Sequence, residues 1–263
     1  MIKNITLGQY FPGNSVIHRL DARIKLLIAI ELIVVIFCLN NWGFLLAAGL
    51  IFVSCLLSKI SVKHLIKGIK PLRFVLLLTF IINVFFIKGE TVLLEWWKIV
   101  ITLEGITKAL TIAVRLILLV AASSMLTLTT SPMEITAALE SLLKPLKAIK
   151  FPVAELALMM SIALRFIPTL MSETDKIMKA QTARGASFDT GNIFEKAKGM
   201  VPILIPLFVS AFKRADELAL AMESRCYNNI IPRTKYRVMK VKGKDFLALG
   251  ICSLLILAAV FGL

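Results

Sequence analysis

Five apolar runs limit what this chain can fold into, because each approaches the length that a helix needs to cross a bilayer. Such a helix takes about 20 mostly apolar residues. Hydrophobic residues make up 58% of the 263 residues, against ~45–50% in ordinary soluble domains. The sequence therefore predicts an all-α integral membrane protein with about five transmembrane helices, at residues 24–40, 42–58, 72–88, 106–130 and 245–263.

The short loops between these runs predict the orientation of the chain. Residues 59–73 contain five basic residues and no acid, which is typical of cytoplasmic loops. The N-terminus then lies on the same side, and residues 89–105, which are richer in Glu than in Lys, lie outside. We expect a multi-pass protein of the plasma membrane whose N-terminus is cytoplasmic.

Residues 131–244 form the one long polar stretch. The segment 155–170 is apolar, but it is short and contains Arg165 and Pro168. If it crossed the bilayer, the strongly basic residues 171–243 would lie outside, against the usual distribution of positive charge. We therefore expect three regions: an N-terminal arm with four transmembrane helices (1–130), a cytoplasmic domain of amphipathic coupling helices (131–244) and a last transmembrane helix (245–263).

The net charge of +15 does not indicate a nucleic-acid partner, because the basic residues flank apolar runs. The lipid bilayer is the expected partner instead. The chain has no phosphate-binding Gly-x-x-x-x-Gly-Lys-Ser/Thr motif and no His-Glu-x-x-His motif. Its four cysteines have no metal-ligand or redox spacing. We therefore expect no catalytic residue, no metal site and no cofactor.

Two charged residues fall inside apolar runs, Glu31 in the first and Arg115 in the fourth. A charge near the bilayer centre costs at least ~2.5–3.5 kcal/mol, so it normally has a partner. The two residues fall at depths that can meet, given the rise of a helix. A structural Glu31–Arg115 pair is the preferred interpretation. A proton relay is the alternative, but no chain of acids accompanies the pair.

Two arginines stand where amphipathic helices run into turn residues, in Ala183-Arg184-Gly185 and Ser224-Arg225-Cys226. A single arginine at a helix end is explained by the helix dipole, which is worth ~0.3–1 kcal/mol. Two such ends in one basic domain favour recognition of carboxylates on a partner, because the arginine fork pairs with them bidentately. The second helix has an apolar face that should contact membrane helices or a partner, with Leu204, Phe208, Phe212 and Leu218.

At these motifs the chain resembles the T component, or transmembrane coupling subunit, of energy-coupling factor transporters. The opening Gly-Gln-Tyr-Phe-Pro-Gly-Asn-Ser (8–15) and His-Arg-Leu-Asp-Ala-Arg-Ile-Lys (18–25) are similar to that family's N-terminus. Leu-Arg-Phe-Ile-Pro (164–168), Glu173 and Ala-Gln-Thr-Ala-Arg-Gly (180–185) resemble its first coupling signature, and residues 214–227 resemble the second. Ser224 and Cys226 replace the Ala and Gly of the family pattern.

The resemblance implies a complex with two cytoplasmic ATP-binding-cassette ATPases and a small membrane protein, the S component, that captures the substrate. Arg184 and Arg225 would each sit in a groove of one ATPase. The apolar face of the second helix would slide against the S component. The chain itself would be non-catalytic, and would transmit ATP hydrolysis into uptake of vitamins, metals or other micronutrients. Which substrate is taken up would depend on the S component.

Two other classes of protein are less compatible with the sequence. A membrane-embedded enzyme should have His, Asp or Glu clustered at membrane depth, and no such cluster is present. A stand-alone permease or channel should have interrupted helices and inverted repeats near the midplane, and neither is clear. Copurification of ATPase subunits would separate the first class from both alternatives.

Overall fold

The structure of the chain is a computed structural model, and its contacts divide it into two compact units. The bundle unit comprises Gly8–Val153 and Met239–Leu263, and the crossed-helix unit comprises Met1–Leu7 and Ala154–Val238. The start of the N-terminal arm and residues 228–240 lie outside the part of the chain that the structure describes. The described residues are 10–39, 41–87, 91–96, 99–186, 188, 192–227, 241 and 243–261.

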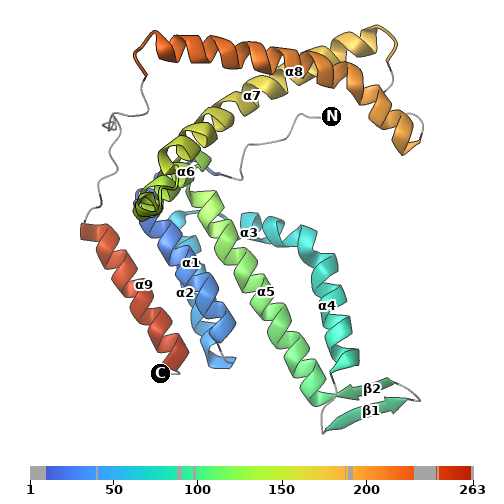
Figure 1. Ribbon diagram of the computed structural model, residues 1–263. Coiled ribbons are helices and arrows are strands. Elements are labelled where there is room, and N and C mark those ends of the chain that lie inside the picture. Colours follow the sequence, from blue (N-terminus) through green and yellow to red (C-terminus); the bar gives the residue numbers. More distant parts are fainter. Residues whose placement is uncertain are drawn as a thin grey trace. The chain divides into compact units, whose positions relative to one another are not determined.

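The bundle unit is organised around one long helix, α5 (Leu103–Thr129), which lies between α1 and α2 on one side and α4 on the other (Figure 1). Leu118, Ala121 and Ala122 of α5 join the main apolar core with residues of α1 and α2. Helix α6 packs on α1, and α9 packs on both α1 and α2. The other helices are α1 (Ala22–Cys38), α2 (Asn41–Ser58), α3 (Val62–Ile69), α4 (Arg73–Phe86), α6 (Pro132–Leu142) and α9 (Gly243–Phe261).

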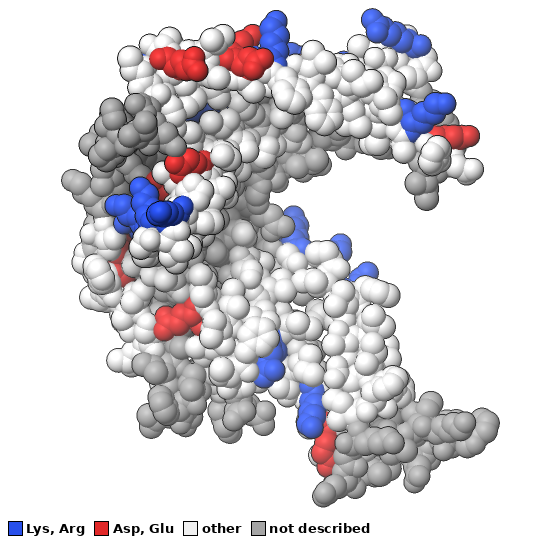
Figure 2. Space-filling model, viewed as in Figure 1, with Lys and Arg blue, Asp and Glu red and all other residues white. Residues whose placement is uncertain are grey.

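Three described helical segments are long and apolar enough to cross a membrane: Val62–Phe86, Leu103–Thr129 and Val153–Ala183. Shorter apolar helices such as Gly43–Ser58 accompany them. Large apolar side chains remain exposed along α4, for example Phe74 at 72% and Phe86 at 79%. On the face drawn in Figure 2, residues other than Lys, Arg, Asp and Glu cover most of the described surface. A soluble monomer rarely exposes so much apolar surface, so the chain is an all-α membrane protein, as predicted.

Helices form at all five predicted runs, and the structure extends one of these runs and the separate apolar segment 155–170. The run 72–88 continues backwards through the 3-10 turn η1 (Lys70–Leu72) into α3, which carries Lys63 and Lys67 on exposed positions and buries Leu65. The apolar segment 155–170 belongs to a single helix of 31 residues, α7 (Val153–Ala183). By length and composition alone α7 meets the requirement for a span, whereas the sequence interpretation placed it in the cytoplasmic domain.

One short hairpin interrupts the helical fold. Strands β1 (Val92–Trp96) and β2 (Ile99–Thr102) pair antiparallel in the segment 89–105. β-Branched residues are concentrated in β2, which favours extended backbone. The hairpin was not anticipated, because the segment is too short and too mixed in charge to show a clear alternation of apolar and polar residues.

The crossed-helix unit consists mainly of α7 and α8 (Ile193–Glu223), which are both 31 residues long. The amphipathic helix expected around residues 204–222 lies within α8. Asn192 and Glu195 form a capping box that begins α8, because the two side chains satisfy the first free amides. Residues 131–153, which form α6 and the 3-10 helix η2 (Lys144–Ile149), belong by their contacts to the bundle unit. The contact boundary thus falls at Val153, later than residue 131, where the predicted cytoplasmic domain begins.

A buried lysine fixes the end of α5. Lys25 is only 7% exposed, and its Nζ donates to the carbonyl oxygens of Thr129 at 3.1 Å and His18 at 3.2 Å. The last carbonyls of a helix have no partner within it, and the ammonium supplies one for α5. The Phe11 amide donates to a second such carbonyl, that of Leu128, at 3.0 Å. The end of α5 is thus tied to both α1 and the N-terminal arm.

The N-terminal arm is held in turn by His18. Its ring nitrogens lie 2.7 Å from Ser15 Oγ and 3.0 Å from the Phe11 carbonyl oxygen. Gly13 is required beside the ring, because a Cβ there would lie 2.9 Å from His18 Cε1. The start of α9 joins the same region, where Asp245 Oδ1 accepts from the Asp21 amide at 3.2 Å.

We expect Lys25→Met to destabilise the bundle unit by about 3 kcal/mol, because it leaves two buried carbonyls without a charged donor. Thermal unfolding of the detergent-solubilised protein measures this as a lower apparent Tm. Lys67→Met is the matched control, since Lys67 is exposed on α3. If the two variants unfold at the same temperature, the ammonium of Lys25 does not hold the end of α5.

Candidate functional site

The first arginine motif forms the C-terminal cap of α7. The Gly185 amide donates to the Thr182 carbonyl and the Ala186 amide to the Gln181 carbonyl, both at 3.0 Å. Gly185 has a φ of 87°. This pair of bonds around a left-handed residue is the Schellman motif. Arg184 is the last residue before the left-handed one, so the backbone turns away directly after it.

The second motif repeats this geometry without a glycine. The Cys226 amide donates to the Glu223 carbonyl at 2.9 Å, and the Tyr227 amide donates to the Met222 carbonyl at 3.0 Å. Cys226 takes the left-handed conformation with a φ of 56°. A side chain in that conformation costs about 1 kcal/mol or more relative to glycine. Ser224 and Cys226 therefore change the residues of the motif but preserve the cap, and Arg225 holds the position equivalent to Arg184.

Both arginines are available to a partner. All six motif residues are exposed, namely Ala183, Arg184, Gly185, Ser224, Arg225 and Cys226. Within the described part of the chain, neither guanidinium has a hydrogen bond or an ion pair. Because nothing inside the described chain uses these forks, they can pair with carboxylates or phosphates of another molecule.

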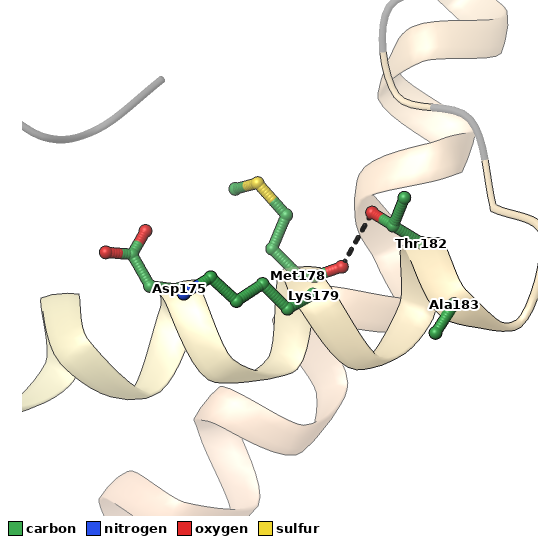
Figure 3. Close-up of a pocket in the computed structure, with 5 residues that line it drawn as sticks. All are labelled: Asp175, Met178, Lys179, Thr182 and Ala183. Atoms are coloured by element: carbon green, nitrogen blue, oxygen red, sulfur yellow. Dashed lines mark hydrogen bonds between the residues drawn. The ribbon is translucent and has the colours of Figure 1, made fainter.

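One face of α7 leads directly to the Arg184 end (Figure 3). It borders an open depression of about 450 Å³, and the residues that line it recur every three or four positions and so share one side of the helix. The Thr182 hydroxyl donates to the Met178 carbonyl at 2.8 Å. Asp175 and Lys179 add one charge of each sign. The lining residues are Asp175, Met178, Lys179, Thr182 and Ala183.

Helices α7 and α8 are joined by polar side chains where they cross (Figure 1). Glu173 of α7 accepts from Ser210 Oγ at 2.6 Å and from Arg214 at 2.9 Å, both on α8. The Glu173 and Arg214 side chains are 23% and 37% exposed. The sequence interpretation quoted Glu173 and Arg214 as parts of the two signatures but did not predict this contact. One signal for it was present, since the two residues are 41 positions apart, as are Arg184 and Arg225.

The predicted apolar face of α8 divides into two. Leu204, Phe208 and Phe212 are 49%, 63% and 68% exposed and recur every four residues, so they form one open face. Leu218 is half-buried, as are Ser210 and Arg214, which face α7. The first three residues are therefore available to a partner together, whereas Leu218, one turn beyond Arg214, is less exposed.

The two charges inside the apolar runs do not meet in the structure. Glu31 Oε2 accepts from Ser253 Oγ of α9 at 3.0 Å. The Arg115 guanidinium lies 5.7 Å from the centre of the Phe44 ring, which is within the range of a cation–π contact. The Arg115 Nε atom is buried without a hydrogen-bond partner. Glu31 thus contacts α9 and Arg115 contacts α2, instead of the predicted contact with each other.

The described residues contain no group of three or more His, Cys, Asp or Glu that could hold a metal ion. The features that stand out are therefore the two arginine ends and the open apolar face of α8. These features define the class of the chain as a helical membrane protein with a second helical unit whose charged ends and apolar face are open to a partner.

The comparisons with known proteins agree with this class. Residues 13–236 match the family model CbiQ, described as cobalt transport protein. The chain is 51% identical over 252 residues to the energy-coupling factor transporter transmembrane protein EcfT of Ruminiclostridium cellulolyticum, covering 95% of this chain and 94% of that one. The protein of the same name from Clostridium kluyveri is 49% identical over 258 residues, covering 97% and 95%. The chain therefore belongs to the family of energy-coupling factor transporter transmembrane proteins.

The left-handed residue of each cap can be tested by hydrogen exchange. Cys226→Gly should relieve about 1 kcal/mol of strain, which slows exchange of the residue 226 and Tyr227 amides about fivefold. Gly185→Ala should have the opposite effect on the Ala186 amide. Ser224→Gly is the control, since Ser224 is right-handed with a φ of −62° and glycine should loosen the helix there. Faster exchange in Cys226→Gly would contradict the left-handed cap.

Proposed function

We propose that this transmembrane component couples ATP hydrolysis by two cytoplasmic ATP-binding-cassette ATPases to a substrate-binding S component, for uptake of vitamins or other micronutrients. The observation that carries the proposal is the pair of exposed arginines, without a partner among the described residues, at two helix ends with the same cap. Two equivalent ends suit two equivalent acidic grooves, one on each ATPase. The names of the relatives, energy-coupling factor transporter transmembrane proteins, support membership of such a complex.

In this proposal the chain has no catalytic residue and binds no cofactor of its own. Its sequence lacks a phosphate-binding loop, so ATP hydrolysis is assigned to the partner ATPases. The mechanism is mechanical. The ATPases hold Arg184 and Arg225 in their grooves, and a change in the separation of the grooves moves the ends of α7 and α8.

The open face of α8 supplies the contact with the S component. Leu204, Phe208 and Phe212 expose about half or more of their surface, and a soluble helix face of this kind is normally covered. A contact made by aliphatic and aromatic side chains, without fixed hydrogen bonds, allows one surface to slide over another. Movement of α8 is thereby passed to a protein in the membrane.

The proposal requires the arginines to lie in the cytoplasm, and therefore places the N-terminus and residues 131–244 on the cytoplasmic side of the plasma membrane. Helix α7 is long and apolar enough to span. If it did, both arginine ends would lie outside the cell. The basic residues that follow α7 favour the cytoplasmic location.

Cysteine accessibility decides between these two topologies. In a cysteine-free background, a cysteine at the exposed position Lys198 should not react with a membrane-impermeant maleimide in intact cells, and should react after permeabilisation. A cysteine at Thr91, in the segment predicted to lie outside, is the matched control and should react in intact cells. Labelling of residue 198 before permeabilisation would place α7 across the bilayer and remove the proposed ATPase contact.

The arginines themselves are tested by assembly and transport. Truncating one side of a buried charge pair costs ~2–5 kcal/mol, and two sites on one subunit reinforce each other. Arg184→Ala or Arg225→Ala should weaken copurification of the ATPases, and the double variant should abolish both copurification and uptake. Lysine should rescue poorly, because it lacks the planar fork. Lys176→Ala and Lys213→Ala, exposed on the same helices, are the controls. Normal assembly of the double variant would refute the coupling role.

A further inference from the structure

The contact between α7 and α8 lies at the same distance along each helix from its terminal arginine. Arg184 follows Glu173 by eleven residues, and Arg225 follows Arg214 by the same eleven. At 1.5 Å per residue, each arginine end lies about 16 Å along its helix from the contact. Beyond the contact, α7 and α8 thus each continue as an arm of the same length toward their C-terminal ends. Both arms end in the same cap with the same arginine.

The contact itself is small but directional. One Glu173 oxygen accepts from Ser210 Oγ at 2.6 Å, and the other accepts from the Arg214 guanidinium at 2.9 Å. Arg214 Nε also lies 3.4 Å from Ser210 Oγ, which closes a three-membered network. Ser210 and Arg214 are one turn apart on α8, so a single carboxylate of α7 holds two successive turns of α8 in register.

The exposure of this network indicates that it does not serve mainly to stabilise the fold. Its charged side chains are 23% and 37% exposed, and exposed ion pairs contribute only ~0.2–1 kcal/mol. What the two hydrogen bonds to Glu173 do provide, with the third aligning their donors on α8, is a fixed rotation and register of one helix against the other. A small change at the crossing becomes a large change at the two ends, because each arm extends about 16 Å beyond it.

We propose that Glu173, held by Ser210 and Arg214, is a positioning residue: it fixes the point at which the two helices pivot, and with it the separation of the Arg184 and Arg225 ends before the partner grooves move. This inference rests on the proposed function, because a fixed separation is useful only if the two ends engage two sites of a partner. With the contact in place, a force on either end moves both arms together. Without it, each arm follows its own ATPase, and hydrolysis is no longer converted fully into movement of α8.

The separation is measured directly by electron–electron resonance between two spin labels. Lys179 and Leu220 are exposed, and each lies six residues beyond its member of the contact, so cysteines there report on the arms without altering the arginine motifs. The background replaces Cys38, Cys55 and Cys252 with Ala and Cys226 with Gly. A single narrow distance distribution is expected for the parent protein, and a broader, shifted one for Glu173→Gln and for Arg214→Gln.

The functional measurement is substrate taken up per ATP hydrolysed by the complete complex in liposomes. Glu173→Gln and Arg214→Gln should each lower this ratio about two- to tenfold while the ATPases still copurify. The double variant should be no worse than either single, because both act through one contact. Lys213→Gln, which removes a neighbouring exposed charge, should match the parent in both measurements.

The two proposals fail in different ways. The coupling role is refuted if the complex assembles normally when both arginines are removed, whatever the distances between the spin labels. The positioning role is overturned if Glu173→Gln leaves the distance distribution unchanged, or if the distribution broadens while the uptake per ATP stays at the parent value. Additive losses in the double variant would also overturn it, since they would mean that the two residues act separately.

Discussion

The ammonium of Lys25 is the interaction on which the bundle depends, because it completes the end of the central helix. Four helices pack on α5, yet the carbonyls at its C-terminus have no partners within the helix. Lys25 supplies one donor from α1, and the Phe11 amide supplies another from the N-terminal arm. The chain then continues through Ser131, which caps the start of α6 together with Glu134. A single buried charge thus joins the first helix of the bundle to the end of the central one.

Local sequence accounts for most of the helices and for one of the two caps. The apolar runs predicted α1, α2, α4, α5 and α9, since helix formation in such runs needs only composition and length. Gly185, after Arg184, is the residue type that favours a left-handed cap. Cys226 has no such preference, and its left-handed conformation accompanies the bonds that the Cys226 and Tyr227 amides donate to the Glu223 and Met222 carbonyls. The equivalence of the two ends was visible in the sequence only through the two arginines.

The choice of partners for charged residues could not be predicted in the same way. Glu31 and Arg115 have compatible depths, but depth does not specify the rotation of each helix. The structure turns Glu31 toward Ser253 and Arg115 toward Phe44. Glu173 and Arg214 lie on separate helices, and only the crossing of α7 and α8 brings them within 2.9 Å.

The two units differ in what they leave exposed, and this difference points to function. In the bundle unit, Lys25 Nζ and the His18 ring have defined hydrogen-bond partners, and the polar atoms without a partner among the described residues, such as Arg115 Nε, are buried. In the crossed-helix unit, two arginine forks and three large apolar side chains remain open to solvent. Neither feature stabilises this chain alone, and a sequence that breaks the rules of folding locally usually does so at a functional site. Exposed guanidinium forks suit acidic grooves and an exposed apolar face suits an apolar one, so under the proposed function one helical unit contacts two chemically different partners at once. A rigid crossing of α7 and α8 would then convert binding of the first partner into movement of the second.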